Sequence, residues 1–291
     1  MAHAFGLAGV MGWPVSHSRS PLMHNLWLKQ HGISGVYVPL PVQPERLADA
    51  LRGLPALGFA GCNLTIPHKV AAMAHMDEID PLARRMGAMN LVVVGPEGQL
   101  KGYNTDGFGF WQSLIDAQPQ FRADAGPVVV LGAGGAARAV VLSLLERGAP
   151  SIRLLNRTEE KAQQLAQELS ESGVAGVIDV LPWSARESAL QGCALLVNTT
   201  SLGMQGKPEL SLRLDALPPE SLVCDVIYVP LETALLKQAR ERGHVTVNGL
   251  GMLMNQARHP SMSHVENATQ FSDGYPGKIL VLGTLGFGDA I

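Results

Sequence analysis

The chain has 291 residues, and at roughly 100–200 residues per domain this length predicts two domains. Hydrophobic residues make up 46% of the sequence and charged residues 16%, so there is ample material for buried cores. The 22 basic and 25 acidic residues give a net charge of −3, which argues against a nucleic-acid binder and against a polybasic membrane anchor. We therefore expect a globular protein that acts on small molecules, with neither nucleic acid nor a membrane as its partner.

The cysteines and the N-terminus indicate a reducing compartment. Cys62, Cys193 and Cys224 form no C-x-x-C pair and are odd in number, so neither a disulfide framework nor a zinc site is expected. The first residues, MAHAFGLAGVMGW, have no basic lead before their apolar stretch, which argues against a secretory signal. The histidines show no metal-ligand spacing. The sequence thus predicts a cytoplasmic protein without a bound metal.

Residues 1–105 alternate strand-like and helix-like segments. Strands are expected at 5–11, 35–40, 58–65 and 90–94, and helices at 21–31, at 44–54 and from Pro67 onward. This βαβ rhythm predicts an α/β domain with a largely parallel sheet.

A second α/β rhythm begins near residue 124. Strands are expected at 127–131, 151–156, 176–180, 194–200, 222–228 and 244–249. One helix is expected after the GAGGAA segment at 132–137, running to Glu146, and another at 159–170. Six strands with intervening helices predict a doubly wound domain. We therefore divide the chain into residues 1–105, residues 106–248, and a final segment, 249–291, that contains a return helix and a tail; residues 106–117 are expected to cross between the domains.

A glycine-rich turn predicts a dinucleotide site. Gly132, Gly134 and Ala137 fit G-x-G-x-x-A, and the pattern follows a predicted strand and opens a predicted helix, as this fingerprint requires. Gly132 would allow the tight turn, Gly134 the approach of a pyrophosphate, and Ala137 close packing of helix on strand. The cofactor would be contacted at Gly132, Ala133, Gly134, Gly135 and Ala136.

The end of the next strand indicates NADP. An NAD-selective site places an acid there to bind the ribose 2′-hydroxyl, but this chain has Asn156, Arg157 and Thr158. The guanidinium of Arg157 suits a 2′-phosphate, and Lys161 lies one helical turn further on. Thr158 is also a plausible N-cap of the following helix.

Four polar segments of the first half are candidates for a substrate site. Ser18 and Ser20 lie at the predicted start of a helix, where hydroxyls and free N–H groups can bind a carboxylate, and Ser20 suits the cap. Lys69 lies in the first turn of another helix, after the segment NLTIP. The other two segments are GAMN at 87–90 and NTDG at 104–107. Any one of these is more often structural, so their order and spacing carry the argument.

Together the motifs resemble the shikimate dehydrogenase family, NADP-linked reductases of aromatic amino-acid biosynthesis. The matching segments are PVSHSRSP (14–21), NLTIPHK (63–69), GAMN (87–90), NTDG (104–107), GAGGAAR (132–138), NRT (156–158) and GLGMLMNQA (249–257). The resemblance implies an N-terminal substrate domain, a Rossmann-type NADP domain, and reversible reduction of 3-dehydroshikimate to shikimate.

The resemblance also implies residue roles. Lys69 and Asp106 correspond to the catalytic pair, and Ser18 and Ser20 to the carboxylate ligands. Further residues correspond to substrate or nicotinamide contacts: Thr65, Asn90 and Gln256 at the hydroxyls, Tyr228 near the carboxylate, and Gly249 and Met252 beside the nicotinamide. A cationic Lys69 could stabilise alkoxide charge and donate a proton, with no metal required.

After Ala257 the sequence departs from the family pattern. Pro260 and the glycine-rich residues that follow show no amphipathic helix. Two alternatives therefore stay open: a quinate or broader quinate/shikimate dehydrogenase, or a dinucleotide-binding homologue made inactive by its tail. A tetrahydrofolate dehydrogenase of similar layout lacks support from PVSHSRSP. The chain could be a monomer or a homodimer.

Overall fold

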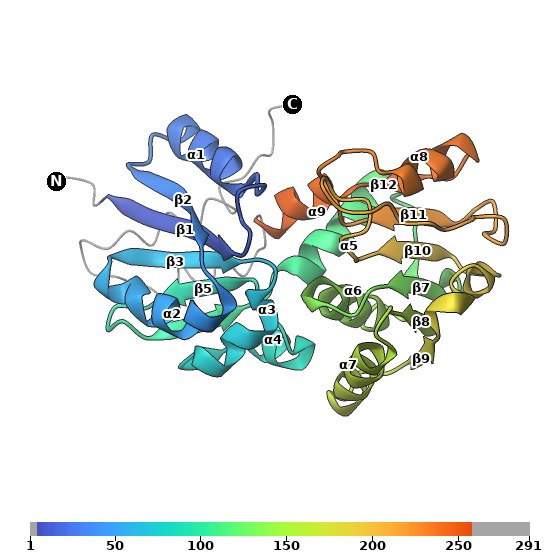
Figure 1. Cartoon of the computed structure of the whole chain (residues 1–291), viewed down its shortest axis with the longest axis horizontal. Coiled ribbons are helices and arrows are strands. Elements are labelled where there is room, and N and C mark those ends of the chain that lie inside the picture. Colours follow the sequence, from blue (N-terminus) through green and yellow to red (C-terminus); the bar gives the residue numbers. More distant parts are fainter. Residues whose placement is uncertain (1–4, 258–291) are drawn as a thin grey trace. The chain divides into compact units, whose positions relative to one another are not determined.

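The computed structural model describes residues 5–257, which form two compact units (Figure 1). Of these residues, the first unit contains those up to Thr105 together with Ala257, and the second unit contains Asp106–Gln256. The sequence-based interpretation of residues 258–291 lies outside the described range. No helix of the described residues is long and apolar enough to cross a membrane.

The first unit is built on a mixed six-stranded sheet. Its strands are β1 (Gly6–Gly12), β2 (Gly35–Pro41), β3 (Phe59–Leu64), β4 (Glu78–Ile79), β5 (Leu91–Val94) and β6 (Leu100–Tyr103), in the order β2-β1-β3-β5-β6-β4. Pairs β1–β2, β1–β3 and β4–β6 are parallel, whereas β3–β5 and β5–β6 are antiparallel. The prediction of a mostly parallel sheet is thus confirmed, but the hairpin of β5 and β6 was not predicted.

The helices of the first unit are short. They are α1 (Ser20–Gln30), α2 (Leu47–Ala56), α3 (His68–Ala71) and α4 (Pro81–Met86), and a 3-10 turn (Pro44–Arg46) precedes α2. In α2, Leu47, Leu51 and Leu54 recur on one face and are buried. The prediction that Ser20 caps α1 is wrong, because Ser20 is already helical and the flanking Arg19 makes no side-chain cap.

The second unit has the doubly wound sheet that the sequence predicts. Its strands are β7 (Val128–Leu131), β8 (Ser151–Leu155), β9 (Val177–Leu181), β10 (Leu195–Asn198), β11 (Leu222–Asp225) and β12 (Thr246–Val247), in the order β12-β11-β10-β7-β8-β9 (Figure 1). All five pairs are parallel. Strands β7, β10 and β11 are buried at every residue, as expected for a sheet covered by helices.

Five helices accompany this sheet: α5 (Asp106–Ala117), α6 (Gly135–Leu145), α7 (Glu159–Glu171), α8 (Ala234–Glu241) and α9 (Gly249–Gln256). Helices α5 and α9 pack closely because glycine lets their backbones approach. A Cβ built on Gly109 would lie 2.6 Å from the backbone N of Gln256, and one on Gly251 would lie 2.9 Å from the Cβ of Ser113. The side chain of Asn255 also donates to Asp116 at 2.9 Å.

Candidate active site

The glycine-rich turn of the second unit lies where the strand order reverses. The chain passes from β7 to β8 on one side, while β10 pairs with β7 on the other. Gly132 follows β7 with φ +110°, a conformation that favours glycine, and its Cβ would lie 2.5 Å from Thr199 Oγ1. Ligands of open α/β sheets bind outside the carboxyl ends of the strands at such a reversal.

Gly134, unlike Gly132, has open space where a side chain would begin. It is the N-cap of α6 with φ −94°, and a Cβ there would meet no atom within 4 Å. Helix α6 also begins without a side-chain cap. The protein itself therefore leaves space at Gly134 and helical N–H groups beside it, which suits a phosphate.

The residues expected at the 2′-phosphate follow β8 on the same edge of the sheet. The side chain of Asn156 donates to the carbonyl of Thr158 at 2.8 Å and so shapes the turn into α7. Thr158 occupies the N-cap position but makes no side-chain cap. Arg157 and Lys161 are exposed, and neither forms an ion pair within residues 5–257. Both cations are thus available to an anionic ligand.

In the first unit, Asn90 is the centre of a buried polar array. Its Oδ1 accepts from the backbone N–H of Thr105 at 2.9 Å, and its Nδ2 lies 3.1 Å from Thr105 Oγ1. Nearby, Asn104 donates to the carbonyl of Ala88 at 2.8 Å. Asn90, Asn104 and Thr105 are at most 5% exposed. The motifs at 87–90 and 104–105, distant in sequence, are therefore joined.

Lys69 and Thr65 follow β3 beside this array. Thr65 N–H donates to the carbonyl of Met11 at 2.9 Å, and a Cβ on Gly12 would lie 2.4 Å from Thr65 Cγ2, so a larger residue at position 12 would displace the Thr65 side chain. Lys69 is half-buried in α3, and its carbonyl accepts from Met89 N–H at 2.9 Å. The predicted helix start is confirmed, and segment 63–69 is joined to segment 87–90.

His68 holds the other side of this short helix. It is buried, and its Nε2 lies 2.8 Å from the carbonyl of Val42. Burial lowers the pKa of His68. The imidazole is therefore an anchor of α3 rather than a group that faces substrate.

Ser18 and Ser20 form a compact turn before α1. The backbone N–H of Ser20 lies 3.3 Å from Ser18 Oγ, and Ser18 N–H donates to the carbonyl of Val15 at 3.0 Å. Ser20 is buried and Ser18 is half-buried. The turn holds both hydroxyls in one short, ordered segment.

Two polar residues of the first unit were assigned no role from the sequence. Asn63 donates to the carbonyl of Asn90 at 3.2 Å, and its Oδ1 accepts from the hydroxyl of Tyr37 at 2.7 Å. The ring of Tyr37 stacks on His24 with centroids 4.2 Å apart. The segment NLTIPHK marked Asn63, but Tyr37 carries no signal because it lies in an apolar strand.

The remaining predicted site residues belong to the second unit. Asp106 begins α5 and is buried, next in sequence to Thr105. Tyr228 is half-buried in the loop after β11. Helix α9 begins at Gly249, carries the buried Met252 and ends at Gln256. Gln256 is thus helical, as the sequence predicts.

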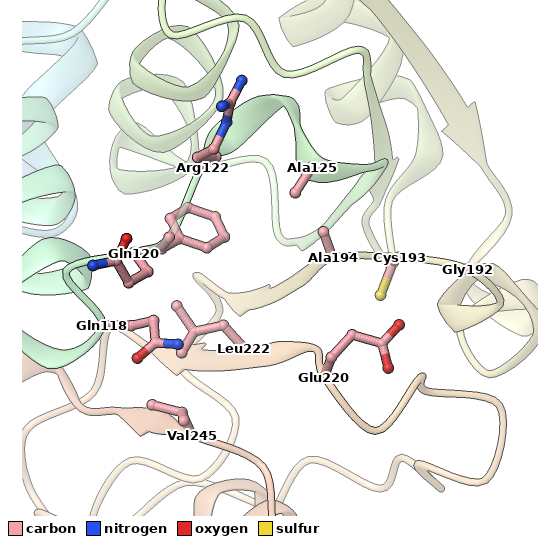
Figure 2. A pocket seen from close by; sticks show the side chains of 11 residues that line it. Gln118, Gln120, Arg122, Ala125, Gly192, Cys193, Ala194, Glu220, Leu222 and Val245 are labelled. Atoms are coloured by element: carbon pink, nitrogen blue, oxygen red, sulfur yellow. The ribbon is translucent and has the colours of Figure 1, made fainter.

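A cavity of about 270 Å³ lies at the opposite edge of the second sheet (Figure 2). It is lined by Cys193, Leu222 and Val245, which lie at or just before the amino ends of β10, β11 and β12, and by Phe121 from the loop after α5. It therefore lies away from the turn at Gly132. Within residues 5–257, no cluster of three or more His, Cys, Asp or Glu side chains could hold a metal ion.

A glycine-rich dinucleotide turn in one α/β unit and a buried amide and hydroxyl array in the other are features of a dinucleotide-dependent dehydrogenase. Residues 10–92 match the model of the shikimate dehydrogenase substrate binding domain, and residues 116–200 match that of shikimate / quinate 5-dehydrogenase. The chain belongs to the shikimate dehydrogenase family.

Individual relatives agree with this assignment. The chain is 54% identical over 251 residues to the shikimate dehydrogenase (NADP(+)) of Paramagnetospirillum magneticum, covering 86% of this chain and 89% of the relative. The quinate dehydrogenase of Corynebacterium glutamicum in complex with NAD is similar at a TM-score of 0.79 and 30% sequence identity. That match covers 87% of this chain and 92% of the quinate dehydrogenase. The shikimate 5-dehydrogenase of Thermus thermophilus in complex with NADP(H) and shikimate is similar at a TM-score of 0.75 and 34% sequence identity. That match covers 95% of this chain and 98% of the Thermus chain.

Proposed function

We propose that this protein catalyses the reversible, NADP-dependent reduction of 3-dehydroshikimate to shikimate. One observation supports it most directly: hydrogen bonds join the segments at 63–69, 87–90 and 104–105 into one array. These segments contain Lys69 and Asn90, and Asp106 follows Thr105 directly. A relative 54% identical to this chain bears the name of that activity.

In the proposed mechanism, Lys69 and Asp106 act in proton transfer. NADPH supplies a hydride to the substrate ketone, and negative charge then develops on the ketone oxygen. The ammonium of Lys69 stabilises that charge and donates the proton, and Asp106 orients Lys69 and the reacting hydroxyl.

The other predicted residues bind and orient the substrate. Thr65, Asn90 and Gln256 bind its hydroxyls, and Asn90 arrives pre-oriented by its two contacts with Thr105. Ser18 and Ser20 bind the carboxylate from their turn before α1, and Tyr228 lies near the carboxylate. In this proposal residues 1–105 are the substrate domain, residues 106–248 the NADP domain, and 249–291 the return helix and tail.

For the cofactor, the turn of Gly132, Ala133, Gly134, Gly135 and Ala136 binds the pyrophosphate at the start of α6. Arg157 and Lys161 bind the 2′-phosphate, assisted by Asn156 and Thr158. Gly249 and Met252 lie beside the nicotinamide. The free space at Gly134 and the unpaired cations of this edge support the assignment.

Quinate oxidation is the second candidate. The quinate dehydrogenase of Corynebacterium glutamicum, structurally similar to this chain, keeps the alternative open. Ser20, rather than threonine, resembles the shikimate-preferring pattern of the family and supports shikimate as the preferred substrate. We also propose a cytoplasmic location, consistent with three free, buried cysteines, and a monomeric or homodimeric state.

A steady-state assay of the purified chain with shikimate and quinate, each with NADP and NAD, tests the function. We expect the highest kcat/KM for shikimate with NADP. A higher kcat/KM for quinate would support the second candidate. No turnover with any pair would instead support a dinucleotide-binding homologue without activity, which cofactor binding by calorimetry would reveal.

A further inference from the structure

A buried carboxylate joins the two loops that leave strands β10 and β11. Asp225 ends β11 and has an exposed fraction of 0%. Its Oδ1 accepts from Asn198 Nδ2 and from the backbone N–H of Ile227, each at 3.1 Å. Its Oδ2 accepts from Thr233 Oγ1 at 2.8 Å. One side chain thus holds the end of β10, the start of the second loop, and the end of that loop.

The partners of Asp225 extend this network along both loops. In the loop after β10, Asn198 Oδ1 accepts from the hydroxyl of Thr200 at 2.7 Å, and Asn198 Nδ2 also donates to the carbonyl of Leu202 at 3.2 Å. After the second loop, Thr233 Oγ1 accepts from Leu236 N–H and caps α8. The conformations of residues 198–202 and 226–233 therefore depend on the same carboxylate.

The buried negative charge of Asp225 lowers the stability of the folded protein. No Lys, Arg or His nitrogen within residues 5–257 lies in ion-pair distance of Asp225. Burial raises the pKa of Asp225 to about 6, and its hydrogen bonds oppose this shift. A buried charge held only by neutral donors weakens folding compared with an apolar replacement. Its cost to stability points to a role in function.

The loops that Asp225 holds lie at the carboxyl edge of the sheet, where doubly wound proteins bind ligands. Tyr228 belongs to the second loop. The carbonyl of Ile227 accepts from Gly249 N–H at 2.9 Å, and a Cβ on Gly249 would lie 2.0 Å from the carbonyl oxygen of Val226. The loop therefore fixes the first residue of α9, the helix that carries Met252.

We propose that Asp225 is a positioning residue for the dehydrogenase reaction: it fixes both loops so that Tyr228, Gly249 and Met252 are in place for hydride transfer. It acts through Asn198, Ile227 and Thr233 and itself touches neither substrate nor cofactor. The proposal rests on the function proposed above.

The variant Asp225→Asn tests this role with little change of shape. The new amide oxygen can still accept from Asn198 and Ile227, but an NH2 group faces the hydroxyl of Thr233 where Oδ2 accepted. We expect kcat for shikimate oxidation to fall by about 10–100-fold, the cost of a small misplacement at the reacting centre. The isotope effect with shikimate deuterated at the reacting carbon should rise, because hydride transfer becomes rate-limiting. Binding of adenosine 2′,5′-bisphosphate should be unchanged, because the glycine turn and Arg157 are intact.

A control beside the same strand separates positioning from stability. Ser221 directly precedes β11, at the end opposite Asp225, is 1% exposed, and donates from Oγ to the carbonyl of Cys193 at 2.6 Å. Ser221→Ala should lower the melting temperature but leave kcat and the isotope effect at wild-type values. Thr233→Val removes the bond to Oδ2 and, with it, the side-chain cap of α8, and it serves if Asp225→Asn does not fold. Its kcat should also fall, by a smaller factor, because Asn198 and Ile227 still hold Oδ1.

The outcomes are distinct. If the wild-type chain is active and the folded Asp225→Asn or Thr233→Val protein retains its kcat and isotope effect, the positioning role is wrong while the proposed function stands. If Ser221→Ala changes the kinetics as much as Asp225→Asn at equal loss of stability, the effect is structural and the proposal also fails. A wild-type chain without dehydrogenase activity overturns the proposed function, and this inference with it.

Discussion

The two units differ in how the sequence supplies their candidate site residues. In the second unit, one strand–turn–helix segment provides the glycine turn, and its key features are a backbone conformation and the absence of side chains. In the first unit, side chains from segments at 63–69, 87–90 and 104–105 are buried together. The cofactor turn is thus a local feature, whereas the substrate array depends on the folded sheet.

Because of this difference, the two sites should be sensitive to different substitutions. A local turn made of backbone tolerates changes that keep its conformation, and it fails where a new side chain enters the space of the ligand. An array of buried amides and hydroxyls loses function when one partner is removed, since the others are left unsatisfied.

Removal of the Lys69 ammonium should have the largest effect on activity. Lys69→Ala should lower kcat by about 10²–10⁴-fold, as for a general acid–base group, with a smaller effect on KM for shikimate. Steady-state kinetics of the purified variant measures this. Lys29→Ala, an exposed lysine at the end of α1, is the control and should behave as wild type. A folded Lys69→Ala protein with near-normal kcat would exclude Lys69 from the chemistry.

Two glycines of the same turn, Gly132 and Gly134, should respond differently to replacement by alanine. Gly132→Ala forces a left-handed conformation and a contact with Thr199, so the free energy of unfolding should fall by about 1–3 kcal/mol. Gly134→Ala meets no protein atom, so stability should be unchanged while KM for NADP rises. Denaturant unfolding and steady-state kinetics on both variants measure the difference. Equal loss of stability in the two variants would contradict the assignment of Gly134 to the ligand.

Much of this architecture could be predicted from the sequence. Apolar runs between turns identified all six strands of the second unit, and a parallel sheet needs crossover helices that are visible as a pattern. Strands β4 and β6 were missed because neither contains an apolar run: β4 is the pair Glu78–Ile79, and Lys101 and Gly102 interrupt β6. Sequence could mark Asn90 and Lys69 as candidates, but only the folded sheet shows that their segments are joined. Tyr37 and Asp225 were missed because they lie in or at the end of apolar strands.

Arg157 should decide between the two dinucleotides. Arg157→Ala should lower kcat/KM for NADP at least about tenfold, which is about 1.4 kcal/mol, and leave KM for NAD nearly unchanged. Kinetics with both cofactors gives the answer. Arg122→Ala, at the opposite edge of the sheet and paired there with Asp124, is the control and should not alter cofactor choice. An equal loss for NADP and NAD would mean that Arg157 does not face a 2′-phosphate.

Carboxylate binding should show a comparable effect in the first unit. Ser18→Ala and Ser20→Ala should each weaken shikimate binding by about 0.5–3 kcal/mol, the range for one hydrogen bond to a neutral or charged partner. KM for shikimate and a dissociation constant from calorimetry report it, and the two variants should leave KM for NADP unchanged. If both serine variants keep the wild-type KM for shikimate, the carboxylate binds elsewhere.

The smallest effect should come from Tyr37, and it tests whether the substrate array is coupled at a distance. Tyr37→Phe removes the hydroxyl that Asn63 Oδ1 accepts from at 2.7 Å, while the ring can keep its stacking on His24. Loss of one hydrogen bond should lower the free energy of unfolding by about 1 kcal/mol. Asn63 also donates to the carbonyl of Asn90, so a freer Asn63 should raise KM for shikimate a few-fold and leave KM for NADP unchanged.

Tyr103→Phe is a matched control, because within residues 5–257 the Tyr103 hydroxyl has no hydrogen bond. If Tyr37→Phe loses stability with an unaltered KM for shikimate, Asn63 is held well enough by the sheet alone. The array is then a set of separate contacts rather than one coupled unit.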